Sequence, residues 1–517
     1  MQTLKKHQCS LLAIGLLLFL FSLASCNSKE SLPVPEIVND SIILSGVVVD
    51  ERNDSKENPL EMTLIINNPI SGKERGYYTI PIDEHGQFEL KVPVETNPTL
   101  AIIRSSIGHV ILVCLVGGEK NFSEIRFDKE GKMDFKLSNS VRLNSYDEAF
   151  DVFSETENYC DVIQFMPLYD KSYEEYISIV SENIDCRIAK ALAKYSQMPE
   201  PIKEYLKQEL MLMWFDSKLF SYNDNILYNY RSMNPEELCD SYIAPPEPGR
   251  HYYHFLKDLR LNEQQNLYSI DGGYNIILDN ILSNDTLAIQ EIDDTPIETW
   301  IKSAAEILGD LVGFEKGFFY DQLAIRSYIR QFEDLSKPLT ERQKENIENY
   351  FSNKAISAIL FRENEKIEAL AKYQSAFVIN STPDLPNEQL FEGILSKYAG
   401  SPVIVSFWTT WCRPCIATID KMKELRSNSQ NKEIVFVYIT NTSSQKSLWE
   451  RKVQGFGGEH YYLSKEQWDY IVAHFGLNGI SGYLLFDKTG ALKEKMGSYP
   501  GNDEMQKQFD NLFEIKR

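Results

Sequence analysis

Two cysteines three positions apart stand between a buried strand and a helix, and this segment constrains the fold more than any other. Val403–Phe407 is a continuous apolar run, typical of a strand covered on both faces. Cys412-Arg-Pro-Cys415 follows it, and Ile416–Arg426 has helical periodicity. A C-x-x-C pair at a helix start brings two sulfur atoms within disulfide reach. The segment predicts a redox-active dithiol, with a redox-inert disulfide as the alternative.

The position of the pair predicts different roles for the two sulfur atoms. A helix N-terminus carries unpaired N–H groups and a partial positive charge, which favour the thiolate of Cys412. Because the thiolate is the nucleophile, Cys412 is predicted to attack, and the more buried Cys415 to resolve the mixed disulfide. Pro414 tolerates its missing N–H early in the helix, and Arg413 adds a cation. Trp411 is expected to cover the site.

The rest of residues 377–517 alternates strands and helices. Ile434–Ile439 is a second run of buried-strand type, and a hairpin around Asp487–Gly490 is predicted to join Tyr483–Phe486 to Ala491–Lys495. Further helices are expected at Gln445–Val453, Lys465–Phe475 and Glu504–Phe513. This order implies a mixed sheet covered on both faces, and so an α/β domain.

Residues 378–517 resemble the TlpA/ResA-type thiol–disulfide oxidoreductases of the thioredoxin superfamily. The segments Pro402–Cys415 and Asn478–Gly490 carry this resemblance. It implies a thioredoxin-like fold and dithiol–disulfide exchange on extracytoplasmic proteins. The implied partners are protein thiols or disulfides and a redox donor protein. No cofactor is implied beyond the disulfide Cys412–Cys415 itself.

Several residues depart from the pattern of that family. In an ungapped alignment Ser481 stands where the family usually has a cis-proline, and a short deletion at this point is the alternative. Since a cis bond before another residue costs about 2.5–4 kcal/mol, a reshaped substrate loop is expected there. Ser406 replaces a buried acid common in thioredoxins, Thr418 a frequent glutamate, and Asp420 a kinking proline. The departures favour reduced activity, and the alternative is a non-catalytic binding or assembly lipoprotein with a degenerate thioredoxin-like domain.

Other residues have both a chemical and a packing interpretation. His251 and His254 offer two metal ligands one helical turn apart, but no third ligand with recognisable spacing is visible. A packing role is therefore favoured, and no metal site is predicted. Thr409, three residues before Cys412, fits a thiol peroxidase, whereas the C-x-x-C partner favours disulfide exchange.

The first 25 residues have the features of a targeting segment. Two lysines precede the apolar run Leu11–Leu23, which is too short for a bilayer span of about 20 residues. The run ends in Leu23-Ala-Ser-Cys26, which resembles the bacterial lipobox, whose cysteine is lipidated; an ordinary secretory signal is the alternative. The resemblance implies acyl chains on Cys26 that anchor the chain to a membrane on its extracytoplasmic, periplasmic side. Residues 26–40 are interpreted as a tether.

Cleavage before Cys26 leaves 517 − 25 = 492 residues, enough for about three domains. Residues 41–138 contain short Val-, Ile- and Tyr-rich runs at intervals close to those of an antiparallel sandwich. Residues 139–376 show helical periodicity with a break at Ala244–Gly249. The sequence therefore predicts a multidomain protein with an N-terminal all-β sandwich-like domain, a central α-helical domain and the C-terminal α/β thioredoxin-like domain at 377–517.

The strands expected in the β-domain are Ser41–Val49, Met62–Asn67, Tyr77–Ile82, Gln87–Val92, Thr99–Ile103 and His109–Val116, with a hairpin turn at Asp83–Gly86. The clearest helical patterns of the central region are Ile202–Trp214, Trp300–Leu311, Glu341–Phe351 and Asn364–Tyr373.

Charge and cysteine usage limit the possible partners. Loss of the two signal lysines takes the formal charge from −22 to −22 − 2 = −24. Such an acidic surface argues against nucleic acid and anionic lipid as partners, since both require positive potential. Disulfides persist in exported proteins, so a bridge such as Cys160–Cys186 is one interpretation of the four scattered cysteines, and buried free thiols are the other; Cys114 and Cys239 are the remaining two.

Overall fold

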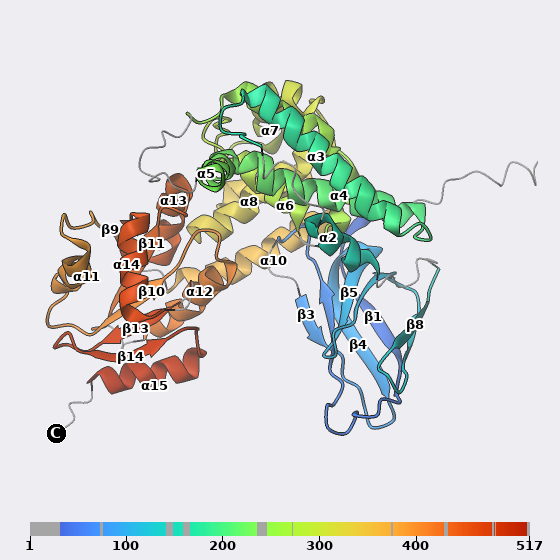
Figure 1. The fold of residues 1–517 in the computed structure, drawn as a ribbon, viewed down its shortest axis with the longest axis horizontal. Coiled ribbons are helices and arrows are strands. Elements are labelled where there is room, and N and C mark those ends of the chain that lie inside the picture. Colours follow the sequence, from blue (N-terminus) through green and yellow to red (C-terminus); the bar gives the residue numbers. More distant parts are fainter. Residues whose placement is uncertain are drawn as a thin grey trace, which may run out of the picture. The chain divides into compact units, whose positions relative to one another are not determined.

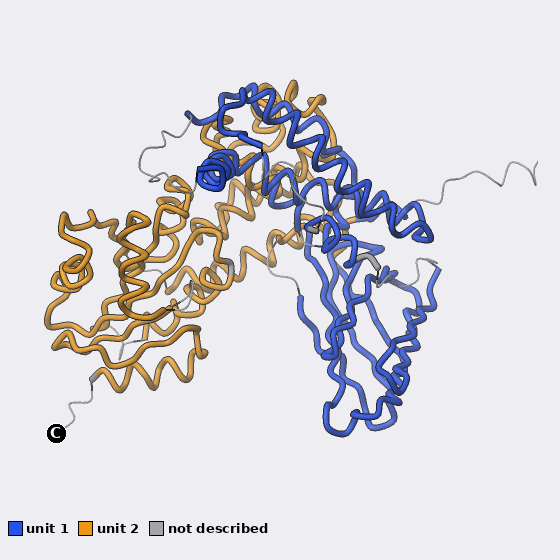
Figure 2. Tube along the Cα trace, viewed as in Figure 1, with its two compact units in different colours: residues 1–36, 40–69, 74–277 blue, residues 37–39, 70–73, 278–517 orange. Residues whose placement is uncertain are grey.

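The computed structural model describes residues 32–72, 76–140, 148–158, 166–234, 246–270, 272–373, 376–428, 433–477, 480 and 482–513. Two compact units divide the chain (Figure 2). Unit 1 comprises residues 1–36, 40–69 and 74–277, and unit 2 comprises residues 37–39, 70–73 and 278–517. The segment 139–376 is thus shared between the units. The three-domain boundaries stay a prediction.

Two four-stranded sheets form the β-region of unit 1, in the orders β4-β1-β7-β8 and β3-β2-β5-β6. The pairing is mixed, because β1 and β7 run parallel with Leu44 opposite Asn121, whereas β7 and β8 are antiparallel. The sequence did not indicate β7 or β8. The strands are β1 (Glu36–Asp50), β2 (Met62–Ile66), β3 (Gly76–Thr79), β4 (Gln87–Asn97), β5 (Thr99–Ser105), β6 (Val110–Leu115), β7 (Asn121–Phe127) and β8 (Met133–Ser138).

The turn expected at Asp83–Gly86 lies between β3 and β4. The backbone N–H groups of His85 and Gln87 donate to Asp83 Oδ1 at 2.9 and 2.8 Å. Gly86 has a φ of +76°, and a Cβ at this position would lie 2.2 Å from the Val48 carbonyl oxygen. The turn therefore requires glycine both for its backbone conformation and for the close approach of β1.

Helices follow the β-region in unit 1. The longest, α3 (Tyr173–Lys194), begins at a capping box in which Ser172 and Glu175 each accept from the other's backbone N–H. Its buried face repeats every fourth residue from Tyr176 through Val180 and Ile184. The other helices are α2 (Glu148–Asn158), α4 (Glu200–Phe215), the π-helical turn η2 (Asp216–Phe220), α5 (Tyr222–Met233), the 3₁₀ helices η4 (Arg250–Leu259) and η5 (Gln264–Tyr268), and α6 (Gly273–Ser283), which ends in unit 2.

Unit 2 combines further helices with the C-terminal α/β domain (Figure 1). The helices α7 (Ile297–Val312), α8 (Phe318–Leu335), α9 (Glu341–Tyr350) and α10 (Lys354–Ala371) come first. Most side chains of α8 are buried, polar ones included. None of the helices in the described ranges has the length and hydropathy needed to cross a bilayer.

The C-terminal sheet has the order β14-β13-β10-β11-β12-β9. Strands β10, β11, β12 and β9 are parallel, and β13 and β14 are antiparallel additions at one edge. This mixed sheet was predicted, but β9, β12 and the helix α11 were not. The strands are β9 (Phe377–Ile379), β10 (Val403–Phe407), β11 (Val435–Asn441), β12 (Gly458–Leu463), β13 (Tyr483–Phe486) and β14 (Leu492–Met496).

Helices cover both faces of this sheet. One buried cluster joins the sheet to α12 (Arg413–Ser427), α13 (Lys446–Phe456) and α15 (Asn502–Phe513), and it contains Cys415 and Trp408. A second cluster joins the opposite face to α11 (Asn387–Ser396) and α14 (Lys465–Phe475). The C-terminal region is therefore an α/β domain of three layers, as predicted.

A buried ion cluster connects α8 to α13 within unit 2. Asp334 of α8 lies 2.5 Å from Lys452 Nζ, 3.0 Å from Arg451 Nε and 3.3 Å from Arg330 Nε. Burial alone would raise the pKa of Asp334, but Lys452 and Arg330 outweigh burial and hold this pKa below its usual range. A Cβ on Gly455 would lie 2.9 Å from the Leu335 carbonyl carbon, so the two helices approach closely.

Candidate functional site

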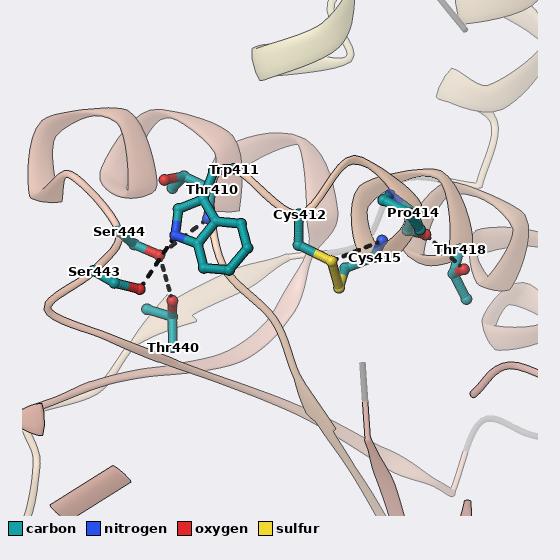
Figure 3. Close-up of a disulfide and its surroundings, with 9 residues drawn as sticks. All are labelled: Thr410, Trp411, Cys412, Pro414, Cys415, Thr418, Thr440, Ser443 and Ser444. Atoms are coloured by element: carbon teal, nitrogen blue, oxygen red, sulfur yellow. Dashed lines mark hydrogen bonds between the residues drawn. A yellow bond between two sulfur atoms is a disulfide. The ribbon is translucent and has the colours of Figure 1, made fainter. Parts of the chain in front are cut away.

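The cysteine pair lies at the junction of β10 and α12. Phe407 ends the buried strand, and the loop 408–412 leads to Arg413, the first residue of α12. Cys412 and Cys415 form a disulfide with their Cα atoms 5.3 Å apart, a separation ordinary for disulfides (Figure 3). The backbone N–H of Cys415 donates to Cys412 Sγ at 3.3 Å, so this sulfur caps the helix N-terminus. The predicted position of the pair at a helix start is present.

The two cysteines differ in access to solvent. Cys412 is half-buried, whereas Cys415 is 2% exposed and belongs to the core cluster under α12. The helix N-terminus favours negative charge on the sulfur that caps it. An incoming thiol or disulfide can thus reach Cys412, while Cys415 is available only to Cys412.

A loop after β11 holds the backbone before the cysteines, as Figure 3 shows. The N–H of Thr410 donates to Ser444 Oγ at 3.0 Å, and Ser444 Oγ lies 2.7 Å from Thr440 Oγ1. Both serine and threonine side chains are buried here. We call residues 440–444, the last two residues of β11 and the turn that follows it, the serine loop. It fixes the approach of the chain to Cys412 with neutral hydroxyl groups.

Trp411 is bound to the same serine loop. Its indole Nε1–H donates to Ser443 Oγ at 3.2 Å, and Ser443 Oγ donates to Asn441 Oδ1 at 2.6 Å. The Trp411 side chain is 59% exposed, while Trp408 is fully buried. Trp411 therefore presents a large apolar surface to solvent beside Cys412 rather than filling the core.

Hydroxyl groups also replace the carboxylates expected near Cys415. Ser406 of β10 is buried and lies opposite Tyr483 of β13 in the sheet register. Burial raises the pKa of Tyr483 to about 12, and hydrogen bonds with Thr418 and Ser406 oppose that rise. Thr418 Oγ1 also donates to the Pro414 carbonyl at 2.8 Å. At neutral pH these groups are all uncharged.

Asp420 is the acid nearest in sequence to Cys415, and it is paired. Its Oδ1 lies 2.6 Å from Nζ of Lys423, a fully buried lysine that also donates to Ser336 Oγ at 2.7 Å. His460 is buried, with its Nε2 3.1 Å from the Gly457 carbonyl oxygen. Burial lowers the pKa of His460 to about 3, so its ring is neutral at physiological pH.

Several predicted site residues lie outside the described part of the chain. They are Ser481, the lipobox cysteine Cys26, and two of the scattered cysteines, Cys160 and Cys239. For Arg413 only the backbone is described. Cys186 is an exposed free thiol, and Cys114 is a buried one. Burial raises the pKa of Cys114 to about 12, so this thiol stays protonated.

The histidine pair packs against itself. The rings of His251 and His254 have their centroids 4.3 Å apart, and His254 Nδ1 lies 2.7 Å from the His251 carbonyl oxygen. Among the described residues no group of three or more His, Cys, Asp or Glu side chains is arranged to hold a metal ion.

The sequence analysis did not predict that the serine loop lies beside the cysteines. Its signal was present, because the polar residues Thr442-Ser-Ser444 follow β11 directly. Carboxyl ends of neighbouring parallel strands meet at one sheet edge, where ligand and catalytic groups collect. The polar residues after β11 are therefore expected to lie beside Thr409 and Thr410, which follow β10.

Comparison with known proteins places the similarity in the C-terminal region. Residues 384–509 match the family model described as Redoxin. The chain is 26% identical over 142 residues to the thiol-disulfide oxidoreductase ResA of Geobacillus thermodenitrificans, an alignment covering 27% of this chain and 80% of the relative. It is 29% identical over 101 residues to the thioredoxin-like protein YneN of Bacillus subtilis, covering 20% and 55% respectively.

Two solved structures are also similar, each over 23% of this chain. One is an exposed lipoprotein thioredoxin from Streptococcus pneumoniae, with 16% identity, 89% of its chain covered and a TM-score of 0.20. The other is a thiol:disulfide interchange protein from Chlorobium tepidum, with 20% identity, 83% of its chain covered and a TM-score of 0.21. The Redoxin match contains both cysteines of the disulfide.

Proposed function

We propose that this chain, whose C-terminal domain is of the TlpA/ResA type in the thioredoxin superfamily, catalyses thiol–disulfide exchange on protein substrates through Cys412 and Cys415. One observation carries the proposal. The accessible sulfur of the pair caps the N-terminus of α12, while its partner is buried one turn further along. That asymmetry separates an attacking thiol from a resolving thiol.

The exchange transfers two electrons from the Cys412/Cys415 dithiol to a substrate disulfide. In the reduced protein the Cys412 thiolate attacks one sulfur of a substrate disulfide. A new S–S bond joins Cys412 to the substrate, and the other substrate sulfur leaves as a thiolate. The Cys415 thiolate then attacks Cys412 Sγ, which closes the intramolecular disulfide and releases the second substrate thiolate. A redox donor protein must return two electrons before the next cycle, and the reverse sequence oxidises a substrate dithiol.

Insulin reduction by the full chain, with dithiothreitol as electron source, tests this function. Wild type should accelerate precipitation of the insulin B chain, and Cys412→Ser should abolish the acceleration. Cys415→Ser should retain attack but fail to resolve, so a covalent complex with insulin should accumulate on a non-reducing gel. Cys186→Ser removes an exposed free thiol outside the pair and should behave as wild type.

Failure of wild type to exchange with insulin, at any ratio of reduced to oxidised dithiothreitol, would sink the proposal. The same titration gives the reduction potential of the pair. A potential of about −270 mV would indicate a reductant and one of about −120 mV an oxidant.

We further propose that the protein works on the extracytoplasmic, periplasmic side of a bacterial membrane, anchored by lipid on Cys26. The lipobox-like sequence Leu23-Ala-Ser-Cys26 supports this location. Radiolabelled palmitate should be incorporated into the expressed full chain and lost in Cys26→Ala. Labelling of Cys26→Ala equal to that of wild type would contradict the anchor.

A second candidate is a binding or assembly lipoprotein in which the thioredoxin-like domain is a scaffold. Ser406 and Thr418 favour it, because neither hydroxyl can act as a base near neutral pH in the way that a carboxylate does. In that case the double variant Cys412→Ser/Cys415→Ser would retain the partners captured by wild type. Loss of capture in the double variant favours catalysis.

A further inference from the structure

An ion pair lies on α12, about two turns beyond Cys415, and the exchange chemistry assigns no role to it. Lys423 Nζ is 2.6 Å from Asp420 Oδ1, and the side chains of Lys423 and Asp420 are 0% and 32% exposed. Lysine is almost never buried to this degree unless it is paired. The pair therefore places a cation inside the domain, with its anion nearer to water.

The end of α8 holds the ammonium group of Lys423 in place. Lys423 Nζ donates to Oγ of the buried Ser336 at 2.7 Å. Ser336 ends α8 with a φ of +48°, a left-handed conformation that is uncommon for residues other than glycine. A Cβ on Gly455 of α13 would lie 2.8 Å from Ser336 Oγ, so α13 packs directly against this hydroxyl group. Because α8 and α13 fix the serine, the ammonium group has a defined position.

Lys423 belongs to a buried row of side chains on α12 that starts at Cys415. Cys415, Ile419 and Lys423 follow each other at intervals of four residues, and all three are buried. Residues at this spacing lie on one face of a helix. At about 1.5 Å of rise per residue, Asp420 is about 7.5 Å and Lys423 about 12 Å along the axis from Cys415. Ile419 stands between Cys415 and Lys423 on this face, so water screens the charge of Lys423 only weakly.

Charges at this position act unequally on the two redox states of the cysteine pair. The disulfide is neutral, whereas the reduced pair carries its thiolate at Cys412. A nearby cation stabilises a thiolate and a nearby anion destabilises it. Lys423 therefore favours the reduced pair, which raises the reduction potential, and Asp420 opposes this effect. The ion cluster around Asp334 also lies at the end of α8, and its charges stay the same when only α12 is altered.

We propose that the ion pair Asp420–Lys423, held by Ser336 at the end of α8, tunes the reduction potential of the Cys412–Cys415 pair. Neither charged side chain reacts, so both are positioning residues. The inference rests on the proposed function, because it assigns a control to the same dithiol. It also makes α8 a part of the redox unit, since Ser336 fixes the cation.

Equilibration of the full chain with glutathione buffers tests the proposal. Alkylation of free thiols and mass analysis of the peptide with both cysteines then give the equilibrium constant for reduction of the pair. Asp420→Asn removes the anion and should raise this constant at least about threefold, and Lys423→Met removes the cation and should lower it at least about threefold. For a two-electron couple, threefold corresponds to about 14 mV. Shifts of the same sign in the two variants would overturn the proposal.

Matched variants of α12 separate charge from damage to the fold. Lys421→Met makes the same substitution at an exposed lysine of this helix and should change the constant by less than about 1.5-fold, because water and salt screen that charge. Asp420→Glu keeps the anion and should stay within about twofold of wild type. Asp420 is one-third exposed, so these variants complete the test even where Lys423→Met does not fold. Equal constants for Asp420→Asn and Asp420→Glu would overturn the proposal.

The same measurements distinguish this inference from the proposed exchange function. The reduction potential concerns only the bond between Cys412 and Cys415, so it is measured without a protein substrate. Opposite shifts in Asp420→Asn and Lys423→Met, in a chain that fails to reduce insulin, would refute exchange on proteins and support the effect of the ion pair. Normal insulin reduction with one potential in wild type and both variants would refute the effect of the ion pair alone.

Discussion

The two ends of α13 contact their neighbours through different chemistry, although only a few turns separate them. Before its first residue, Ser443 and Ser444 hold the loop that carries Trp411 and Cys412 with neutral hydroxyl groups. Toward its last turn, Arg451 and Lys452 meet Asp334 in a buried ion cluster. Charge is thus concentrated where α13 packs on α8, whereas the contacts of the serine loop with the residues before Cys412 are neutral.

This difference has a physical reason. A fixed charge near Cys412 would add to or oppose the effect of the helix N-terminus on the sulfur, since interactions between charges are long-ranged in a partly buried site. Hydroxyl groups position the loop without adding a charge. At the contact between α8 and α13 no such constraint applies, and buried charges are tolerated because each has a partner.

The largest expected effect is at the charged end. Asp334→Asn leaves Lys452 buried without its anion and removes one of the two carboxylates beside Arg330, and removing one partner of a buried ion pair costs about 3–5 kcal/mol. We expect a loss of that size in the free energy of unfolding, measured with urea. Asp469→Asn, which breaks an exposed pair with Lys465, is the matched control and should cost less than about 1 kcal/mol. Similar losses in both variants would contradict a special role for the cluster.

Acidification should also destabilise the fold by removing the charge of Asp334, but by less than the substitution does. The folded pKa of Asp334 is lowered, so its charge stabilises the fold at pH values above the unfolded pKa of about 3.9. This contribution is lost as the pH falls through the folded pKa. The melting temperatures of wild type and Asp334→Asn should therefore converge below about pH 4. A difference between them that stays constant from neutral to acidic pH would rule out this carboxylate as its source.

The neutral end should give the smallest change in stability. Ser444→Ala leaves the buried N–H of Thr410 without its acceptor, at a cost of about 1–3 kcal/mol in unfolding free energy. The neighbouring Ser443→Ala removes the exposed bond to Trp411 and the bond to Asn441, leaves no buried backbone N–H without an acceptor, and should cost less than about 1 kcal/mol. Insulin reduction should slow more in Ser444→Ala, because the loop before Cys412 loses its anchor. Equal rates in the two variants would show that the serine loop does not position the dithiol.

The sequence predicted the parts of the C-terminal domain that have a local signal. Val403–Phe407 matches β10, and Lys465–Phe475 matches α14, because a fully apolar run and a capped amphipathic helix are each visible in one stretch of residues. In β9 all three side chains are exposed, so no burial pattern could reveal the strand. The parallel pairing of β1 with β7 joins segments far apart in sequence and has no local signature.

In the candidate site, too, the features with a local sequence signal could be predicted and the long-range contacts could not. Cys412, Cys415 and their positions at the start of α12 could be predicted, because motif, strand and helix are contiguous. The contact of Ser444 with Thr410 spans 34 residues, and that of Lys452 with Asp334 spans 118. Such pairs follow from the packing of whole helices, which no short window of sequence contains.

The burial of Asp334 against α13 also decides where the chain can be divided. A fragment starting at residue 376 would retain both cysteines and the whole six-stranded sheet. It would also lack α8, which packs on α13. Lys452 would then lose its counter-ion Asp334, and the surface around Gly455 would be exposed to water. The part of the chain that can be separated is therefore larger than the region similar to Redoxin, because it includes the helices from Leu278 onward. Recombination or engineering at this boundary keeps α13 in its native environment.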